Sequence, residues 1–146
     1  MLLASALPEG ARLVSYDLHA AVETDVPGER LDAELRKVLA RYGFDDRVEL
    51  VVANSHTVDP PAEPLALLFV DGDHSYDGVR ADWLHWRDQL APGGHLLFHD
   101  AVETGGYSTC SEGVVRLVAE IERDARQGFA RQPGAGAIAH FVRLAT

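Results

Sequence analysis

The sequence is poor in cysteine and in lysine, with one residue of each, Cys110 and Lys37. A single cysteine excludes a disulfide within the chain, and disulfides belong to oxidising compartments. No activating neighbour is evident for Cys110, so we expect an unreactive thiol. An apolar run of about 20 residues, the length of a membrane-spanning helix, is missing, and residues 1–7 lack the basic flank of a signal peptide. These absences predict a cytoplasmic protein with no membrane partner.

Positive charge is also scarce. The chain has 13 Lys and Arg residues against 23 Asp and Glu residues, which gives a formal net charge of -10. Because nucleic-acid backbones are bound mainly through Lys and Arg, we expect no nucleic-acid partner. The composition, with 47% hydrophobic and 25% charged residues, is that of an ordinary globular protein. Without a repeat or a low-complexity tract, residues 1–146 are predicted to form a single domain.

Short apolar strands and amphipathic helices alternate along the chain. Strands are predicted at residues 12–17, 47–53, 65–71 and 95–100, and helices at residues 29–42, 77–90 and 112–125. Residues 129–143 predict two strands around a glycine-rich turn. Strands that are apolar throughout are typical of sheets covered on both faces. The pattern predicts an α/β fold, with a Rossmann-like, mostly parallel sheet, helices on both faces and a C-terminal antiparallel hairpin.

Polar side chains follow the first two predicted strands. Asp17 ends the first strand, and Asn54 and Ser55 follow the second. In open α/β sheets, ligands bind beyond the carboxyl ends of the strands. An acid such as Asp17 at that edge can accept hydrogen bonds from both ribose hydroxyls of a nucleotide. Capping of the next helix or turn is the alternative role for this aspartate.

The densest group of candidate ligands follows the third and fourth strands: Asp71, Asp73, His74, His99 and Asp100. If these strands are neighbours joined by a right-handed crossover, their ends lie about 4.8 Å apart and their side chains can share one ion. Carboxylates suit Mg²⁺, Ca²⁺ or Mn²⁺, whereas imidazoles favour Mn²⁺, Fe²⁺ or Zn²⁺, so the identity of the metal stays open. The alternative is that the aspartates only form a turn and cap the following helix.

Other residues with reactive or stacking side chains form no such group in the sequence. His95 and His140 lie far apart along the chain and are expected to be structural. Trp83 and Trp86 share a helical face with Val79, so we expect them in the core.

Two stretches resemble a known family. Residues 69–86 read FVDGDHSYDGVRADWLHW, and residues 90–100 read LAPGGHLLFHD. Together they resemble the central signature of bacterial class I S-adenosylmethionine-dependent methyltransferases of the macrocin O-methyltransferase type. The resemblance implies S-adenosylmethionine as the cofactor. It also implies a sheet in which the family's first strand lies at the centre, between its second and fourth strands.

The resemblance also implies roles for individual residues. In related metal-dependent O-methyltransferases, a metal-binding acid follows the fourth strand, a base stands three residues later, and an adjacent acidic pair ends the fifth strand. By this correspondence Asp71 is the first metal ligand, His74 is the base, and His99 and Asp100 are the pair. The implied ion is Mg²⁺ or Mn²⁺, although His99 replaces the more usual acid or amide. Cofactor contacts are expected from residues at the same strand ends: Asp17, Asn54, Ser55 and Asp71.

One part of the family pattern has no counterpart here. No G-x-G motif precedes Asp17, so the first strand and the loop that hold the cofactor's methionine end are not found. We expect a sheet without its first strand, whose inner edges are closed by rearrangement or by another copy of the chain. The loss of two charge-assisted hydrogen bonds, at about 1.5–3 kcal/mol each, predicts cofactor binding weakened about 10²- to 10⁴-fold.

The leading interpretation is a metal-assisted O-methyltransferase that acts on a hydroxyl of a small molecule, such as a natural-product sugar or a polyphenol. The alternative is a truncated, non-catalytic methyltransferase-like domain that binds a metal, a nucleoside or a partner chain. A phosphohydrolase with Asp71 and Asp73 as nucleophile and acid is disfavoured. That chemistry needs a lysine downstream of the acids, and Lys37 lies upstream.

Overall fold

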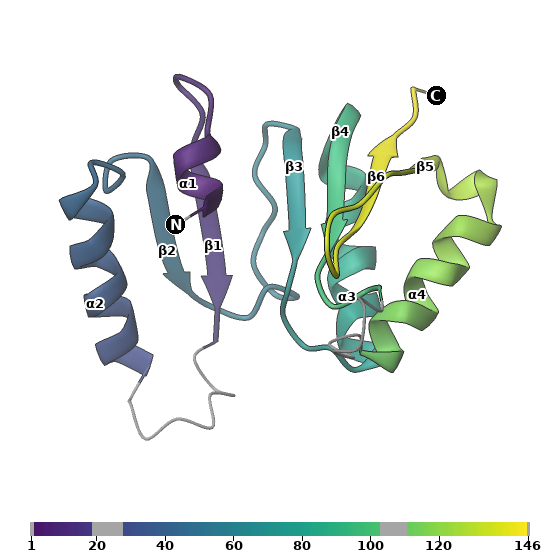
Figure 1. The fold of residues 1–146 in the computed structure, drawn as a ribbon, viewed down its shortest axis with the longest axis horizontal. Coiled ribbons are helices and arrows are strands. Elements are labelled where there is room, and N and C mark those ends of the chain that lie inside the picture. Colours follow the sequence, from purple (N-terminus) through teal and green to yellow (C-terminus); the bar gives the residue numbers. More distant parts are fainter. Residues whose placement is uncertain (1, 19–27, 103–110, 146) are drawn as a thin grey trace. The chain divides into compact units, whose positions relative to one another are not determined.

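The structure is a computed structural model that describes residues 2–18, 28–102 and 111–145 (Figure 1). Its contacts cluster into two compact units, Met1–Val58 and Asp59–Thr146. Cys110, for which an unreactive thiol is expected, lies outside the described residues. No helix in the described ranges has the length and apolar character needed to cross a bilayer.

The first unit holds helix α1 (Leu2–Ala6), strand β1 (Leu13–Asp17), helix α2 (Gly28–Arg41) and strand β2 (Val48–Val52). The two strands pair in parallel, with Leu13 opposite Val48 and Asp17 opposite Val52. A small core joins all four elements around Ala4, Leu39 and Val48. Gly43, at φ 71°, ends α2 with the left-handed residue expected just after a helix.

The second unit holds strand β3 (Leu65–Val70), helix α3 (Tyr76–Trp86), strand β4 (Leu90–Phe98) and helix α4 (Glu112–Arg123), followed by strands β5 (Phe129–Gln132) and β6 (Ala139–Arg143). Two 3-10 turns follow the two helices: η1 (Arg87–Gln89) comes directly after α3, and η2 (Ala125–Gln127) comes after Asp124, which ends α4. The strand order is β3-β4-β6-β5. Strands β3 and β4 are parallel, and β6 is antiparallel to both of its neighbours. The predicted α/β fold, with parallel pairing and a C-terminal antiparallel hairpin, is confirmed.

One boundary differs from the prediction. Strand β4 begins at Leu90 rather than His95, and the α3 segment is correspondingly shorter than residues 77–90. The chain around Gly93 and Gly94, which the sequence suggested was a break, runs as an irregular part of the strand. Leu65 pairs with Leu90, and Leu67 pairs with His95. A Cβ on Gly94 would lie 2.8 Å from the Ala91 carbonyl oxygen, so this glycine permits a close backbone approach.

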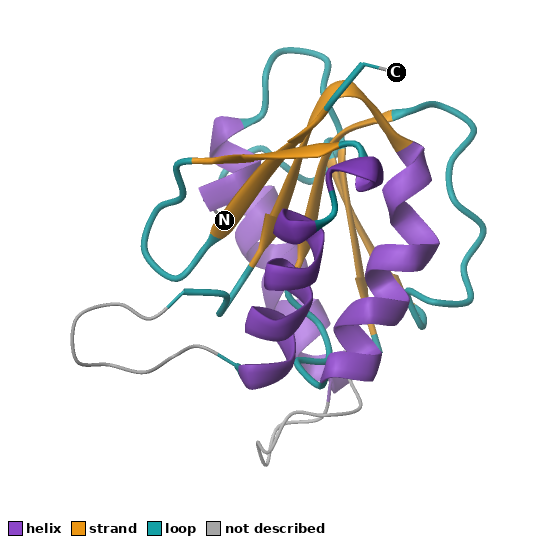
Figure 2. Ribbon diagram, turned by 90° about the vertical axis from the view of Figure 1, so that its right-hand side faces the viewer, coloured by secondary structure: helices purple, strands orange, loops and turns teal. Residues whose placement is uncertain are grey.

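The core of the second unit lies on one face of its sheet, whose twist is visible in Figure 2. Fully buried side chains of strands β4 and β6 pack against buried side chains of helices α3 and α4. The strands contribute Leu96, Phe98 and Phe141, and the helices contribute Val79, Trp83, Val114 and Ile121. The expectation that Trp83 and Trp86 belong to the core is confirmed, at 2% and 5% exposure. At about 25 cal/mol per Å² of apolar area removed from water, this cluster is the main stabilising feature of the unit.

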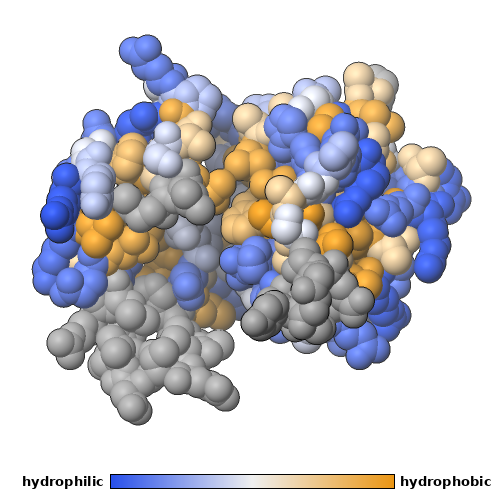
Figure 3. Space-filling model, viewed as in Figure 1, coloured by the Kyte–Doolittle hydropathy of each residue, from blue (hydrophilic) through white to orange (hydrophobic). Residues whose placement is uncertain are grey.

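Strands β1 and β3 are edge strands among the described residues, as are β2 and β5. Strand β1 pairs only with β2, and β3 pairs only with β4. The resemblance places the family's first strand between its second and fourth strands. Without that strand, the pairings that remain are those observed, β1 with β2 and β3 with β4. The expected rearrangement that would close the inner edges is not found in the described ranges. Strand β3 leaves Leu67 37% exposed, and Figure 3 shows hydrophobic surface over this strand.

Neighbouring leucines on β4 offer a matched test of this packing. Leu96 is 0% exposed, whereas Leu97 points to the opposite face and is only half-buried. We expect Leu96→Ala to lower the free energy of unfolding by about 2–5 kcal/mol and Leu97→Ala to lower it clearly less. Both tryptophans lie in the second unit, so urea titrations followed by tryptophan fluorescence report on that unit. Equal losses in the two variants would contradict the assigned faces.

Candidate functional site

In the turn after β3, some polar side chains hydrogen-bond to the backbone of the turn, and others remain able to bind a ligand. The Asp73 carboxylate accepts a hydrogen bond from the Ser75 amide at 2.8 Å, and the Ser75 hydroxyl accepts one from the Gly78 amide at 3.1 Å. Ser75 is therefore the N-cap of α3. A Cβ on Gly78 would lie 2.4 Å from the Asp73 side chain, so this turn needs glycine there. Asp73 thus takes the turn role that was the alternative reading of this motif.

The end of β4 is held in place by backbone hydrogen bonds. The His99 amide donates to the Val70 carbonyl at 3.0 Å, which continues the parallel pairing beyond the strands. Asp100 follows at φ 50°, in the left-handed region that aspartate tolerates better than most residues. Its carbonyl accepts the Ser111 amide at 2.8 Å. These bonds fix the direction in which the His99 and Asp100 side chains leave the strand.

The four predicted side chains meet at this edge. Nδ1 of His99 lies 3.2 Å from Oδ1 of Asp71 and 3.1 Å from Oδ1 of Asp100. The His74 ring lies between the same two acids, with Nε2 3.4 Å from Asp71 and Nδ1 3.5 Å from Asp100. Side-chain exposure ranges from 19% for Asp100 to 45% for Asp71, so the group is open to solvent on one side. Two carboxylates and two imidazoles therefore share one small volume.

One atom of this group suits a bound cation. Nδ1 of His99 is shielded from solvent and has no hydrogen bond of acceptable geometry, although carboxylate oxygens of Asp71 and Asp100 are near. A buried polar atom without a partner costs about 1–3 kcal/mol. Donor atoms of Asp71, His74 and His99 lie within 4.8 Å of one another. A divalent ion that accepts both oxygen and nitrogen ligands, such as Mn²⁺, fits this donor set better than an ion restricted to oxygen.

The residues expected to hold the cofactor belong to both units. In the first unit, Asp17 is exposed at the end of β1, and its carbonyl accepts the Ala53 amide at 3.2 Å. Its place at the carboxyl end of a parallel strand suits a ribose-binding acid. Asn54 uses its side-chain oxygen to accept the His56 amide at 2.8 Å, as in a local turn. Ser55 follows in this turn, whereas Asp71 belongs to the second unit.

The N-terminal half of α4 braces the turn that carries His74. A Cβ on Gly113 would lie 2.5 Å from the His74 carbonyl oxygen and 2.4 Å from the Tyr76 amide nitrogen. The Tyr76 hydroxyl donates to Glu120 at 2.7 Å, and the Arg116 guanidinium lies 3.6 Å from the centre of the Tyr76 ring. The sequence alone gave no sign of this brace beyond a glycine in a helix.

The Tyr76–Glu120 hydrogen bond shifts the pKa of both groups. It raises the pKa of the Tyr76 hydroxyl and lowers the pKa of the Glu120 carboxyl, because it stabilises the neutral phenol and the charged carboxylate together. At neutral pH the Tyr76 phenol is therefore neutral and the Glu120 carboxylate is charged, and this hydrogen bond requires both states.

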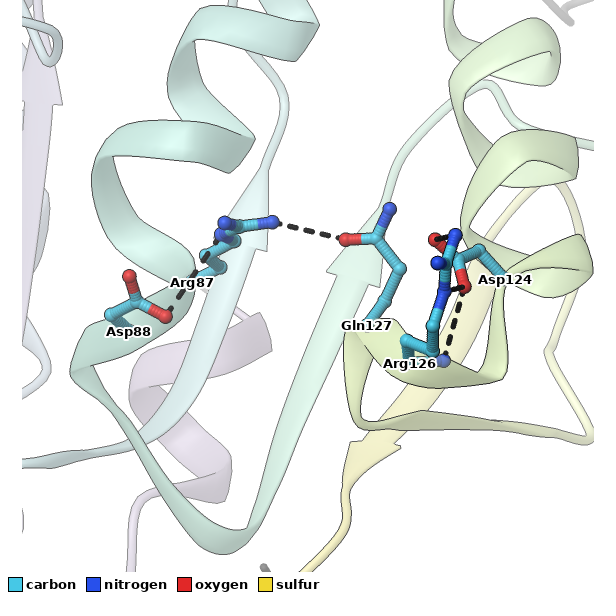
Figure 4. A pocket seen from close by; sticks show the side chains of 5 residues that line it. All are labelled: Arg87, Asp88, Asp124, Arg126 and Gln127. Carbon is cyan, nitrogen blue, oxygen red and sulfur yellow. Dashed lines mark hydrogen bonds and ion pairs between the residues drawn. The ribbon is translucent and has the colours of Figure 1, made fainter.

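A cavity of about 450 Å³ lies away from this group, at the C-terminal ends of α3 and α4 (Figure 4). Its charged side chains have partners within the lining of the cavity. Arg126 pairs with Asp124 at 2.8 Å, and Arg87 donates to Gln127 at 3.0 Å. Helix α3 has 11 residues and is about 16 Å long, so its two ends are well separated. The cavity is therefore separate from the candidate site, and none of the four side chains of that site lines it.

The structure brings together His95 and His140, which nothing in the sequence suggested as a pair. Nδ1 of His95 lies 2.9 Å from Nε2 of His140, across the pairing of β4 with β6. The two residues lie 45 positions apart in the sequence, and only the hairpin brings their strands together.

Comparison with known proteins shows the family. A family model described as a methyltransferase domain matches residues 1–101, more than half of the chain. The chain therefore belongs to this family of methyltransferase domains. Among curated proteins, none has a significantly similar sequence.

Solved structures of methyltransferases share the fold. An O-methyltransferase of tomaymycin synthesis from Streptomyces achromogenes, solved with S-adenosylmethionine, is 17% identical, with a TM-score of 0.66; the match covers 98% of this chain and 66% of that one. A protein described as an rRNA methylase from Clostridium thermocellum is 16% identical, with a TM-score of 0.64 and coverages of 98% and 78%. A TDP-rhamnose 3'-O-methyltransferase of calicheamicin biosynthesis is 20% identical, with a TM-score of 0.61 and coverages of 90% and 58%. These likenesses establish the fold, and the chain spans 58–78% of the length of these three structures.

Gly113→Ala tests the brace. The added methyl group must displace backbone atoms of residues 74–76, so we expect a loss of about 1–3 kcal/mol in the free energy of unfolding. The His74 ring signals in an NMR spectrum should shift as well. Val115→Ala, on the same helix at 39% exposure, is the control and should change little. A Gly113→Ala variant that matches this control in both measurements would contradict the close approach.

Proposed function

We propose that this chain takes part in metal-assisted O-methyl transfer from S-adenosylmethionine to a hydroxyl of a small molecule, as in the macrocin O-methyltransferase type. The observation that carries the proposal is the meeting of Asp71, His74, His99 and Asp100 at the carboxyl edge of β3 and β4. Membership of the methyltransferase-domain family supplies the reaction class.

In this proposal Asp71, His99 and Asp100 hold a divalent ion. The shielded Nδ1 of His99 gains the partner that it lacks, and the repulsion between the two carboxylates is relieved. Such an ion supplies Lewis-acid chemistry that lowers the pKa of a hydroxyl group of the acceptor. The imidazole of His99 favours Mn²⁺ over Mg²⁺, because imidazole is a poor ligand for the harder ion.

His74 is the proposed general base. Its two ring nitrogens face Asp71 and Asp100 at 3.4 and 3.5 Å, so the acids orient the ring and favour its protonated form once a proton arrives. Imidazole is the side chain that most often transfers protons in enzymes near neutral pH. The side chain is 33% exposed, which leaves an acceptor room to approach.

The residues proposed for the cofactor are Asp17, for the ribose, and Asn54, Ser55 and Asp71, each of which follows a strand of its own unit. When bound, S-adenosylmethionine supplies the methyl group. A small acceptor suits the net charge of -10, which opposes a nucleic-acid backbone. Of the three similar structures described above, two are described as O-methyltransferases of tomaymycin and calicheamicin synthesis, which supports a small acceptor, and one as an rRNA methylase.

In the part of the chain that the structure describes, one edge of β1 and one edge of β3 pair with no other strand, and these edges favour a second candidate function. It is a non-catalytic domain that binds a metal, a nucleoside or a partner chain. Edge strands offer rows of backbone donors and acceptors to another chain, including a second copy of this one. The two candidates differ in turnover and share the metal site.

Calorimetry with Mn²⁺ tests the ligands. We expect Asp71→Asn and Asp100→Asn each to weaken Mn²⁺ binding about tenfold or more, because each removes a charged ligand from a three-ligand set. Asp88→Asn is the matched control, since this acid is 75% exposed and lies beyond the far end of α3. Unchanged affinity in both site variants would overturn the metal assignment.

Methyl transfer tests the function itself. We expect the chain to convert S-adenosylmethionine to its demethylated product when polyphenols or natural-product sugars are offered. Millimolar cofactor compensates for the expected weak binding. His74→Gln should lower kcat about 10²- to 10⁴-fold, as expected for loss of a general base. His85→Gln is the histidine control. No turnover by the wild-type chain, with Mn²⁺ binding intact, would reject catalysis and leave the second candidate.

A further inference from the structure

His95 and His140 form a pair on one face of the four-stranded sheet. Leu97 is opposite His140 in the β4–β6 register and Val142 is opposite His95, so the two histidines are diagonal neighbours. Their rings tilt by 34° with centroids 5.1 Å apart, and Nδ1 of His95 faces Nε2 of His140 at 2.9 Å. His95 is exposed and His140 is half-buried, so the space beside the two nitrogens is open to solvent.

The other nitrogen of His140 defines its protonation. Nδ1 lies 3.3 Å from the Pro133 carbonyl oxygen, which can only accept a hydrogen bond. Nδ1 therefore carries the proton, and in the neutral ring Nε2 presents a lone pair toward His95. A ring N–H directed at a backbone carbonyl is also the arrangement that orients histidines bound to metals. A backbone carbonyl of the β5–β6 hairpin thus orients the His140 ring and leaves Nε2 able to bind a metal.

We propose that His95 and His140 form a second metal site, separate from the candidate catalytic group, which takes Cu²⁺ or Ni²⁺. Two nitrogens bound at about 2.05 Å and at right angles to one ion are about 2.9 Å apart, whereas a tetrahedral ion holds them about 3.3 Å apart. The observed 2.9 Å is also the distance of the hydrogen bond that joins the two rings, so the rings must turn slightly for both lone pairs to point at one ion. The spacing is short enough for this, and nitrogen ligands bind Cu²⁺ and Ni²⁺ strongly in a square or tetragonal arrangement. His95 contributes Nδ1 after its proton moves to Nε2, and water completes the coordination.

The site is distinct from the first in place and in chemistry. His95 precedes His99 by four residues on or just beyond the same strand, a separation of about 13 Å along an extended chain. The first group offers two carboxylates, whereas the His95–His140 pair offers only imidazole nitrogen to a metal. The proposal does not depend on methyl transfer.

Copper binding measured in a chain that lacks the first site tests the proposal. In the Asp71→Asn/His99→Gln background, calorimetry with CuCl₂ and glycine as a weak competitor should give one Cu²⁺ per chain. The electron paramagnetic resonance spectrum should show a tetragonal ion with two nitrogen ligands from the protein. Adding either His95→Gln or His140→Gln should weaken binding about tenfold or more, because one ligand cannot chelate. His85→Gln in the same background is the matched control and should keep the affinity.

Three results would overturn the site. Copper affinity unchanged by both His95→Gln and His140→Gln would place the ion elsewhere. A spectrum with one protein nitrogen would show that the pair does not chelate. Binding of Zn²⁺ at least as tight as that of Cu²⁺ would contradict the right-angled geometry. Because the background already lacks two proposed catalytic ligands, failure here leaves the methyltransferase proposal untouched, and failure of that proposal leaves this one testable.

Discussion

The parallel ladder between β3 and β4 is the constraint on which the candidate site depends. It pairs Val70 with Phe98 and continues one residue further through the His99 amide. Because parallel strands end at the same edge, this register brings the residues after β3 next to those after β4. A slip by one residue would turn His99 to the face that holds Phe98 and the core. The buried side chains that fix the register therefore also fix the donor set.

The crossover between these strands supplies the second constraint. Helix α3 starts directly after the site, with Ser75 as its cap, and α4 packs against the same turn through Gly113. Of the acids in the motif, Asp73 satisfies the backbone of the turn, while Asp71 is left to face His99. One short stretch therefore forms both a turn and part of the ligand set. The turn interpretation of the motif applies to Asp73, and the ligand interpretation applies to Asp71.

Metal sites and hydrogen-bonded networks draw on the same side chains, and geometry distinguishes them. At the first group, the shielded nitrogen of His99 faces two carboxylates without a proper hydrogen bond, which favours a cation. At the His95–His140 pair, a hydrogen bond already satisfies both nitrogens, so a metal must compete with a shared proton. The first group therefore suits a resident ion, and the second suits an ion that binds strongly to imidazole.

The sequence by itself determined most of the elements and the first group of ligands. Apolar runs that end in Asp71 and in His99-Asp100 identify buried strands and their polar ends, because a carboxylate is costly to bury without a partner. Local patterns also predicted the C-terminal hairpin and the end of α2 at Gly43. The start of β4 was wrong because Pro92-Gly93-Gly94 is typical of a turn, and only pairing with β3 keeps it extended.

Tertiary structure alone decided the rest. The brace from Glu120 to Tyr76, the approach of Gly113 to the site turn, and the His95–His140 pair all join residues more than 35 positions apart. Contacts of this kind depend on strand register and on helix position. Propensity and periodicity describe only neighbours along the chain, and they carry no information about either.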